Sequence, residues 1–217
     1  MADIHPKTPI PSPLTSTSLP SSPIPEQQGH GLRLTGWDPE SEEQLDAWFR
    51  GLTDPDFGRW NTPLKIVRDR ADARESLRSK AAGAAEGRNA SFRITDAASG
   101  TTLGHIGVND IDHVLSVARV GYWVLPEARG GGVATRALAV AARWALTDLG
   151  LHRLELGHAL GHEASCRIAE RCGFRYEGTL RGAMFEQGRQ DAFRDVHLHA
   201  RIASDPEPEL DPGPGLS

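Results

Sequence analysis

The fold is decided by the stretch Tyr122-Trp123-Val124-Leu125-Pro126-Glu127-Ala128-Arg129-Gly130-Gly131-Gly132-Val133-Ala134-Thr135-Arg136. It has the pattern of an apolar strand, a tight Gly-rich turn and the start of a helix. Three consecutive glycines let the backbone turn sharply and approach a ligand, because no Cβ stands in the way. The first N–H groups of a helix lack intrahelical partners, and the helix dipole adds about half a positive charge there. The stretch therefore predicts a phosphate or pyrophosphate site, with Arg129 as an added cation at its mouth.

Composition places the chain among globular proteins. Of its 217 residues, 38% are hydrophobic and 24% charged, and the formal net charge is −5. The acidic balance argues against nucleic acid as a partner, since phosphate binding needs a basic face. No apolar run reaches the ~20 residues of a membrane span, and no secretory signal is visible. Cys166 and Cys172 are six apart in an expected helix, on different faces, so we predict free thiols and a cytoplasmic location.

Proline marks two extensions of the chain. Residues 1–30 hold seven of the 15 prolines and almost no aliphatic run, and residues 205–217 hold four more. Such segments cannot bury enough apolar surface to offset the entropy lost on ordering. We predict disordered tails at 1–30 and 205–217 around one domain, 31–204.

Hydrophobic periodicity predicts the order of elements in that domain. A strand, two helices, a three-strand meander, a helix, a strand, a helix and two strands are expected at 31–37, 41–52, 69–86, 91–95, 102–109, 114–125, 133–149, 152–157, 163–172, 174–180 and 191–200. The aromatic segment 54–63 is expected to be irregular. A strand–helix–strand unit at 119–157 within an otherwise antiparallel run predicts an α/β (α+β) fold, with helices on both faces of a mixed sheet.

Two motifs resemble those of a known family. The loop Arg129 to Ala134 resembles the R/Q-x-x-G-x-G/A loop of GNAT-superfamily acyltransferases. The stretch Ser165 to Arg181, with its Gly173-Phe174 pair, resembles the S-x-R…GF-x-x-EG-x-L-R block of the RimJ/RimL-type N-acetyltransferases. The resemblance covers most of 31–204. It implies the GNAT fold, in which a mostly antiparallel sheet splays open at its centre, here between the strands 115–125 and 152–157.

The resemblance also implies acetyl-CoA as cosubstrate. Its pantetheine arm is expected in the opening of the sheet, paired with the strand end, and its diphosphate on the amides of the loop, beside Arg129. The implied cofactor-binding residues are Trp123, Val124, Leu125, Arg129, Gly130, Gly131, Gly132, Val133, Ala134, Thr135 and His162. Two other nucleotide loops fit less well, because the G-x-G-x-x-G spacing and the Gly-Lys-Ser/Thr of a P-loop are both missing. A Gly-rich turn that only connects two elements stays an alternative.

Ser165 stands at the position of the family's serine near the CoA sulfur. The resemblance implies a catalytic role, in which its hydroxyl hydrogen-bonds or protonates the departing thiolate. A hydroxyl that satisfies local backbone is the alternative. His162 stands where RimJ/RimL-type sequences usually have Asn, whose amide helps to hold the cofactor and the start of the helix. One imidazole nitrogen cannot both donate and accept as an amide does.

The reaction needs a neutral amine as nucleophile. An α-amino group titrates near ~7.8 and lysine near ~10.4, so an enzyme without a strong base acts more easily on an N-terminal amine. No base is evident in the sequence. The candidates are Asp110, Asp112, His113 and Glu127, and each also fits an exposed residue in a loop or at a strand end.

Histidine spacing predicts no metal site. His158 and His162 are four apart, but in an expected loop and without a third ligand nearby in the sequence. His197 and His199 share one face of a strand, where an edge or core role suffices. A zinc site needs three or four protein ligands.

We therefore predict an acetyl-CoA-dependent N-acetyltransferase, a monomer or homodimer. A primary amine, best a protein N-terminal amine, attacks the thioester directly in a ternary complex, and no acyl-enzyme forms. Walls of the amine site are expected from Phe57 to Trp60 and from the helix 41–52. Two alternatives stay open: a small-molecule amine such as an aminoglycoside as substrate, and a non-catalytic acyl-CoA-binding module.

Overall fold

A single eight-stranded sheet organises the chain. The computed structural model describes residues 24–61, 65–186 and 189–210, and its strands lie in the order β1-β2-β3-β4-β5-β6-β8-β7. Neighbouring strands are antiparallel except β5 and β6, which are parallel. The strands are Gln27–Gly29 (β1), Leu32–Gly36 (β2), Ala90–Asp96 (β3), Thr102–Asp112 (β4), Val117–Val124 (β5), Arg153–Ala159 (β6), Arg175–Phe185 (β7) and Phe193–Ile202 (β8). The predicted mixed, mostly antiparallel sheet is confirmed.

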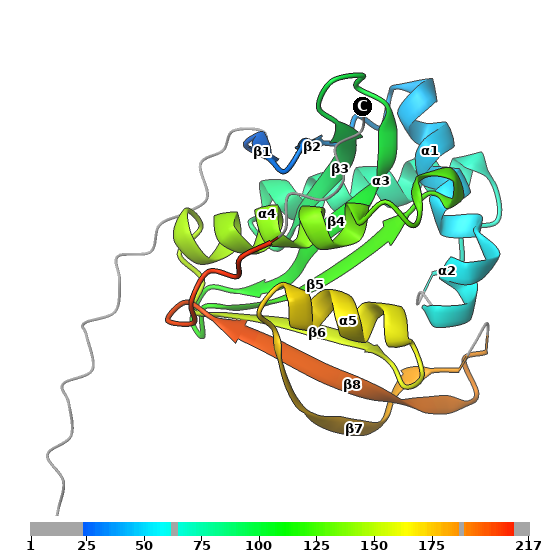
Figure 1. Cartoon of the computed structure of the whole chain (residues 1–217). Coiled ribbons are helices and arrows are strands. Elements are labelled where there is room, and N and C mark those ends of the chain that lie inside the picture. The colour runs from blue at the N-terminus through cyan, green and yellow to red at the C-terminus, as the bar shows by residue number, and fades with distance from the viewer. Residues whose placement is uncertain (1–23, 62–64, 187–188, 211–217) are drawn as a thin grey trace, which may run out of the picture.

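Helices cover both faces of the sheet (Figure 1). They are Glu42–Thr53 (α1), Pro55–Trp60 (α2), Arg70–Ala85 (α3), Val133–Thr147 (α4) and Glu163–Arg171 (α5), with a short 3-10 turn at Pro126–Ala128 (η1). Helix α4 packs against β1, β2, β4, β5 and β6, and α5 continues this layer over β6, β7 and β8. Helices α1 and α3 pack against β4 and β3.

Alternation along β5 divides the apolar side chains between two cores. Trp123 joins a cluster with Leu45 and Trp48 of α1, whereas Tyr122 and Val124 pack against the larger cluster that contains the buried face of α4. Successive side chains of a strand point to opposite faces of the sheet, so neighbours in the sequence enter different cores. Each face of β5 is thus covered by one of the two apolar clusters.

The sheet opens between β5 and β6. These strands pair only over Val117–Arg119 and Arg153–Glu155, although β5 continues to Val124 and β6 to Ala159. Beyond the paired residues the strands diverge, so the end of β5 has no strand partner on its β6 side. The predicted splay at the centre of the sheet is therefore present.

Helix α2 corrects the prediction for residues 54–63. We expected an irregular segment, but Pro55–Trp60 is helical. The Asp54 side chain caps this helix by accepting a hydrogen bond from the Phe57 amide at 3.1 Å. An N-cap Asp followed by Pro at the first helical position is a recognised signal for the start of a helix. The prediction instead took the aromatic residues of this segment as a sign of irregular structure. Residues 62–64 lie outside the described residues.

The described part of each predicted tail is tied to the domain. Strand β1 lies within the predicted tail 1–30 and pairs with β2, and Arg143 of α4 donates to the Gln28 carbonyl at 3.4 Å. In the predicted tail 205–217, Glu207 pairs with the buried Arg201 at 2.6 Å. Residues 1–23 and 211–217 lie outside the described residues, so the division into a domain and two tails stays a prediction.

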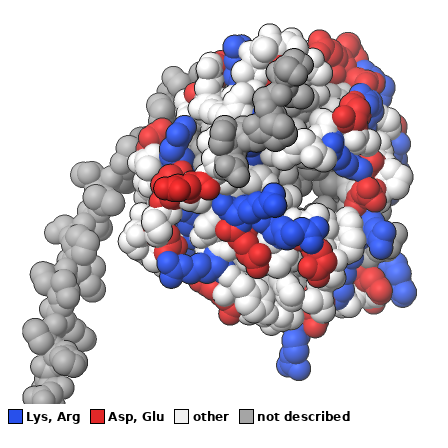
Figure 2. Space-filling view, in the orientation of Figure 1, with Lys and Arg blue, Asp and Glu red and all other residues white. Residues whose placement is uncertain are grey.

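Charge is mixed over the visible surface. On the face shown in Figure 2, Lys and Arg side chains lie beside Asp and Glu side chains rather than in one patch of a single sign. Within the described ranges, none of the helices has the length and apolar character needed to cross a membrane. Cys166 and Cys172 are both free, as predicted.

Candidate active site

A cavity of about 630 Å³ opens beside the end of β5. Its walls come from that strand end, the Gly-rich loop, the first turns of α4 and α5, and α2. Among the predicted cofactor-binding residues, those that line it are Trp123, Val124, Arg129, Gly130, Gly132, Val133, Ala134, Thr135 and His162. Ser165 lines it as well. Trp123 and Arg129 precede the start of α5 at Glu163 by 40 and 34 residues. The structure thus brings both halves of the predicted site into one cavity, of the size expected for a ligand site.

Leu125 and Gly131 are the two predicted cofactor-binding residues that are not among the described residues lining the cavity. The Leu125 side chain is buried with the cluster under α1 and α3, and its amide donates to the Leu103 carbonyl at 2.9 Å. The Leu125 amide is thus already paired within the protein, which leaves the backbone groups of Trp123 and Val124 from the stretch expected to pair with pantetheine. The Gly131 carbonyl accepts a hydrogen bond from Arg136 at 3.2 Å, and Gly131 is not among the described residues that line the cavity.

The Gly-rich loop presents the N-terminus of α4 to the cavity. Gly130 and Gly132 have φ of 80° and 71°, a left-handed conformation that glycine adopts without strain. Gly132 is the N-cap residue and has no side chain to occupy the helix end. A Cβ built on either glycine meets nothing within 4 Å. The first-turn amides of α4 therefore face open space, which suits the diphosphate of CoA.

Arg129 is engaged by carboxylates of the neighbouring helix. Its guanidinium forms ion pairs with Asp54 at 2.6 Å and Asp56 at 2.9 Å, and its Nε donates to the Val124 carbonyl at 3.1 Å. We expected Arg129 to add a fixed cation beside the phosphates. Because two carboxylates already neutralise it, Arg129 fastens α2 to the end of β5 in this structure.

Helix α2 forms the wall opposite α5. Phe57 and Trp60 line the cavity, and the Trp60 ring stacks on His162 with centroids 4.5 Å apart and planes 3° from parallel. His162 is the N-cap residue of α5, yet its side chain makes no capping bond. Burial, with a smaller contribution from His158, lowers the pKa of His162 to about 4. The stacked pair of Trp60 and His162 is therefore uncharged at pH 7. Of the predicted amine-site walls, the segment 57–60 lines the cavity, and α1 does not.

Ser165 is joined to a residue that the sequence reasoning missed. The Tyr122 hydroxyl donates to Ser165 Oγ at 3.2 Å, and Ser165 is only 5% exposed. Burial raises the pKa of Tyr122 to about 12, so its hydroxyl stays protonated at neutral pH. The signal for Tyr122 was the alternation of β5, which sends it to the face opposite Trp123 and so towards α5.

The four candidate bases lie elsewhere. Glu127 and Asp110 are in ion pairs with arginines, Asp112 accepts two loop amides, and His113 bonds to the Gly87 carbonyl at 2.8 Å. None of the four is among the described residues that line the cavity. The acidic residues that do line it are Asp56 and Glu163.

Comparison with known proteins agrees with this geometry. The profile of the acetyltransferase (GNAT) domain matches residues 32–175. The ribosomal-protein-serine acetyltransferase of Escherichia coli (strain K12) is 32% identical over 100 residues, which are 46% of this chain and 54% of that protein. The spermidine N(1)-acetyltransferase of the same strain is 32% identical over 90 residues, 42% of this chain and 48% of that protein. The matched segment thus spans about half the length of these relatives.

A solved structure extends the likeness over most of the chain. The RimJ protein of Mycobacterium smegmatis, in complex with CoA-disulfide, superposes with a TM-score of 0.72. The superposition covers 83% of this chain and 87% of that one, at 26% identity. The family match over residues 32–175 includes the loop, the splayed strands and α5, and the loop, the end of β5 and α5 line the cavity.

Proposed function

The chain belongs to the GNAT family of acetyltransferases, and we propose that it transfers the acetyl group of acetyl-CoA to the N-terminal α-amine of a protein or peptide. One observation carries the proposal. The open N-terminus of α4, the unpaired end of β5 and the Tyr122–Ser165 pair all meet at one cavity. These are an anion site, an extended backbone edge and a hydroxyl relay, the three features that a long thioester cosubstrate requires.

Different groups of the chain would bind different parts of acetyl-CoA. Amides of Gly130 and of the residues from Gly132 to Thr135 would hold the diphosphate. Backbone groups of Tyr122 to Val124 would pair with pantetheine as an added strand. Bound acetyl-CoA supplies an acetyl group activated as a thioester. Neither cysteine is among the described residues that line the cavity, which favours direct attack by the amine over an acyl-enzyme.

Ser165 is positioned to deliver a proton. Because the Tyr122 hydroxyl donates to Ser165 Oγ, the serine's own proton is free to point away from Tyr122. The serine can then donate it to the departing thiolate, while Tyr122 holds the oxygen in place. The proton that the amine nitrogen loses on forming the amide restores the serine hydroxyl, so the products are the amide and CoA thiol. In this proposal Ser165 is the catalytic residue and Tyr122 a positioning residue.

The charge of the cavity favours a single weakly basic amine. Asp56 is bound by Arg129, which leaves Glu163 as the other acid among the described lining residues. A polyamine carries several ammonium groups and needs several carboxylates to balance them. Deprotonating a lysine side chain costs about 3.5 kcal/mol more than deprotonating an α-amine, and the neutral Trp60–His162 wall offers no strong base to do so.

A panel of acceptors tests the proposed substrate class. Purified protein with acetyl-CoA is given peptides with a free α-amine, the same peptides with a blocked N-terminus and one free lysine, spermidine, and an aminoglycoside. We expect kcat/KM for the free α-amine to exceed that for lysine by at least about tenfold. A preference for spermidine or the aminoglycoside would replace the protein amine by a small molecule. CoA binding without turnover on any acceptor would indicate the binding-module alternative.

The cofactor half of the proposal has a matched pair of variants. Gly132→Ala and Gly100→Ala both place a Cβ on a glycine with φ near +70°, at 71° and 74°, and in both cases the Cβ meets nothing within 4 Å. Both should therefore lose a similar stability, about 1–2 kcal/mol. Only Gly132→Ala should weaken CoA binding, by about tenfold or more in calorimetric Kd. Equal CoA affinity in the two variants would remove the loop from the cofactor site.

A further inference from the structure

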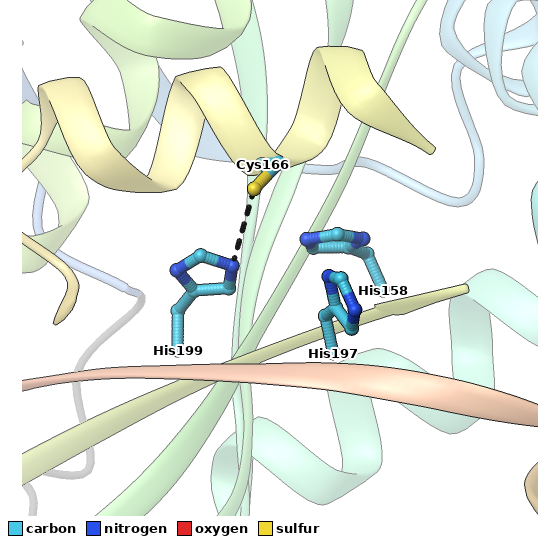
Figure 3. A group of neighbouring side chains, drawn as sticks. All are labelled: His158, Cys166, His197 and His199. Carbon is cyan, nitrogen blue, oxygen red and sulfur yellow. Dashed lines mark hydrogen bonds between the residues drawn. The ribbon is translucent and has the colours of Figure 1, made fainter. Parts of the chain in front are cut away.

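Three histidines and a cysteine gather between α5 and the strands β6 and β8, outside the described residues that line the cavity. His158 of β6, Cys166 of α5, and His197 and His199 of β8 each present one ligand atom, and these atoms all lie within 4.8 Å of one another. Figure 3 shows the imidazoles rising from the two strands towards the thiol on the helix above them. Cys166 is not among the described residues that line the cavity, although its neighbour Ser165 is.

The register of the sheet builds this cluster. His158 lies directly opposite His197 in the β6–β8 pair. His199 is two residues further along β8, so it points to the same face. Helix α5 crosses that face and contacts both strands, which places Cys166 Sγ 3.6 Å from His199 Nε2. Four side chains from three elements are thus aimed at one point.

The hydrogen bonds of His158 leave one nitrogen ready for a ligand. Its Nδ1 lies 3.1 Å from the Ala159 carbonyl, and since a carbonyl only accepts, Nδ1 carries the proton. Nε2 then holds a lone pair, and it is buried without a hydrogen-bond partner, in a side chain only 5% exposed. An imidazole whose second nitrogen donates to a backbone carbonyl is the usual arrangement of a metal-bound histidine.

We propose that His158, Cys166, His197 and His199 form a binding site for a single Zn²⁺ ion. Bond lengths of about 2.0–2.1 Å to nitrogen and 2.3 Å to sulfur put tetrahedral N and S ligands ~3.6 Å apart, the separation that Cys166 and His199 already have. The other separations close by small side-chain rotations, since all four atoms lie within 4.8 Å. A thiolate with three imidazoles suits zinc over hard cations that prefer oxygen ligands.

The protonation states of the free site are consistent with a metal that displaces one proton. Burial lowers the pKa values of His158 and His199, which keeps both imidazoles neutral as ligands. Burial and the nearby Glu170 and Glu163 raise the pKa of Cys166, so the thiol is protonated in the free protein. Zinc binding would convert Cys166–SH to the thiolate, form the Zn–S bond and release one proton to buffer.

Such a site would clamp α5 onto β6 and β8. This helix carries Ser165 in its first turn and has His162 as its N-cap residue, so a metal bound to Cys166 would also help to fix the position of these two lining residues. The inference does not depend on acetyl transfer, because none of the four proposed ligands is among the described residues that line the cavity.

Zinc alone is the probe that tests the site. Tag-free full-length protein, treated with a chelator and without CoA, is titrated with Zn²⁺ by calorimetry in two buffers of different ionisation enthalpy. We expect one Zn²⁺ per chain, about one proton released, and a raised melting temperature. Cobalt(II) in place of zinc should give the intense visible bands of a tetrahedral site and a near-ultraviolet thiolate-to-metal absorption.

Matched variants separate this site from adventitious binding. Cys166→Ser and His199→Asn should each weaken Zn²⁺ binding by at least about 100-fold, and Cys166→Ser should also abolish the proton release and the thiolate absorption. The control His152→Asn changes an exposed histidine outside the cluster and should bind zinc as the wild type does. Circular dichroism checks each fold, and if His199→Asn does not fold, the Cys166→Ser readouts decide. Substoichiometric binding, or affinity unchanged in Cys166→Ser, would overturn the proposal.

Discussion

At the scale of single residues, Tyr122 and Ser165 are the pair whose separate effects can be measured. Tyr122→Phe removes the hydroxyl that donates to Ser165 and keeps the ring. We expect kcat to fall about 10²-fold, at the lower end of the effect of a proton donor, because Ser165 remains but is no longer held. KM for acetyl-CoA should change little. Steady-state kinetics over both substrates measures the two parameters.

The chain provides its own control for this change. Its only other tyrosine is Tyr176, whose hydroxyl bonds to Thr179 at 2.9 Å outside the cavity, so Tyr176→Phe should leave kcat unaltered. Ser165→Ala should lose at least as much as Tyr122→Phe, and the double variant little more than Ser165→Ala alone, since the two act as a unit. If Tyr122→Phe kept full kcat while Ser165→Ala lost it, Tyr122 would have no positioning role.

The sequence alone indicates an anion site at the Gly-rich loop, but it does not indicate which distant residues contact each other in the fold. Three glycines before a helix already indicate an anion site, because their conformational freedom is a local property. The stack of Trp60 on His162 and the ion pairs of Arg129 join residues about 70 to 100 positions apart. Only the packing of α2 against the cavity brings these residues together, and no local pattern encodes that.

At the scale of elements, α2 depends on Asp54 for two different interactions. The carboxylate caps the helix at the Phe57 amide and pairs with Arg129. Asp54→Asn keeps a capping oxygen and loses the ion pair, which should cost at most about 1 kcal/mol since Arg129 is partly exposed. Asp54→Ala loses both and should cost about 1 kcal/mol more. Urea unfolding measures these losses, and amine KM should rise severalfold in both variants because α2 carries Trp60.

Asp69→Ala is the matched control for the cap. Asp69 caps α3 by accepting a hydrogen bond from the Asp72 amide at 2.9 Å, away from the cavity. It should lose about 1 kcal/mol of stability and keep the wild-type amine KM. An amine KM that rises equally in Asp69→Ala would show that global softening, rather than the anchoring of α2, affects the acceptor.

Element prediction succeeded where periodicity was long and failed where elements were short. The expected helix at 133–149 is observed at Val133–Thr147, because apolar positions recur over four turns. The three-residue strand β1 and the six-residue helix α2 are too short to show a period. Their stability comes from β2, α4 and Arg129, which lie elsewhere in the sequence.

At the scale of the whole molecule, the buried His105 links stability to pH. It lies in a cage with Trp37, Trp48 and Trp123, with ring centroids 4.8 to 6.2 Å away. Burial, with a smaller contribution from Lys80, lowers the pKa of His105 from 6.5 to about 3. Between these values the unfolded chain binds a proton that the folded chain does not. The free energy of unfolding should therefore fall as pH drops below about 6.5, by up to about 1.4 kcal/mol per pH unit from this histidine.

A difference in slope isolates this histidine from the others. His105→Gln cannot take up the proton. Its free energy of unfolding should therefore fall less than that of the wild type between about pH 7 and pH 5, by the contribution of this one histidine. His152→Asn, an exposed position, should keep the wild-type slope. Urea unfolding at the two pH values gives the comparison, and equal slopes in His105→Gln and the wild type would contradict it.

The register of the central strands is the feature that sequence reasoning could not reach. His158 and His197 are 39 positions apart, and their pairing depends on β8 inserting between β6 and β7. A shift of one residue would turn His197 and His199 to the opposite face. The expectation of no metal site followed from looking for a third ligand nearby in sequence, whereas the cluster is assembled by topology.

The C-terminal boundary of the domain is a further property of the whole molecule. The proline content of residues 205–217 predicted that the domain ends at 204. Local composition does not show that the buried Arg201 has its ionic partner, Glu207, beyond that point. Arg201 has a side chain only 3% exposed, and its described ionic partner is Glu207, at 2.6 Å. Asp205 also accepts the Ile202 amide at 3.0 Å, and Leu210 packs against the main core.

Two truncated chains test whether the domain ends at residue 204, as composition predicted, or extends to Leu210. A chain that ends at Ser204 leaves Arg201 buried without its carboxylate and should lose about 3–5 kcal/mol of unfolding free energy. A chain that ends at Leu210 keeps all these contacts and should match the full-length protein within about 0.5 kcal/mol. Glu207→Gln in the full chain removes the charge alone and should fall between them. Equal stability of the two truncated chains would mean that Arg201 finds another partner or reaches solvent, and the boundary predicted from composition would then be correct.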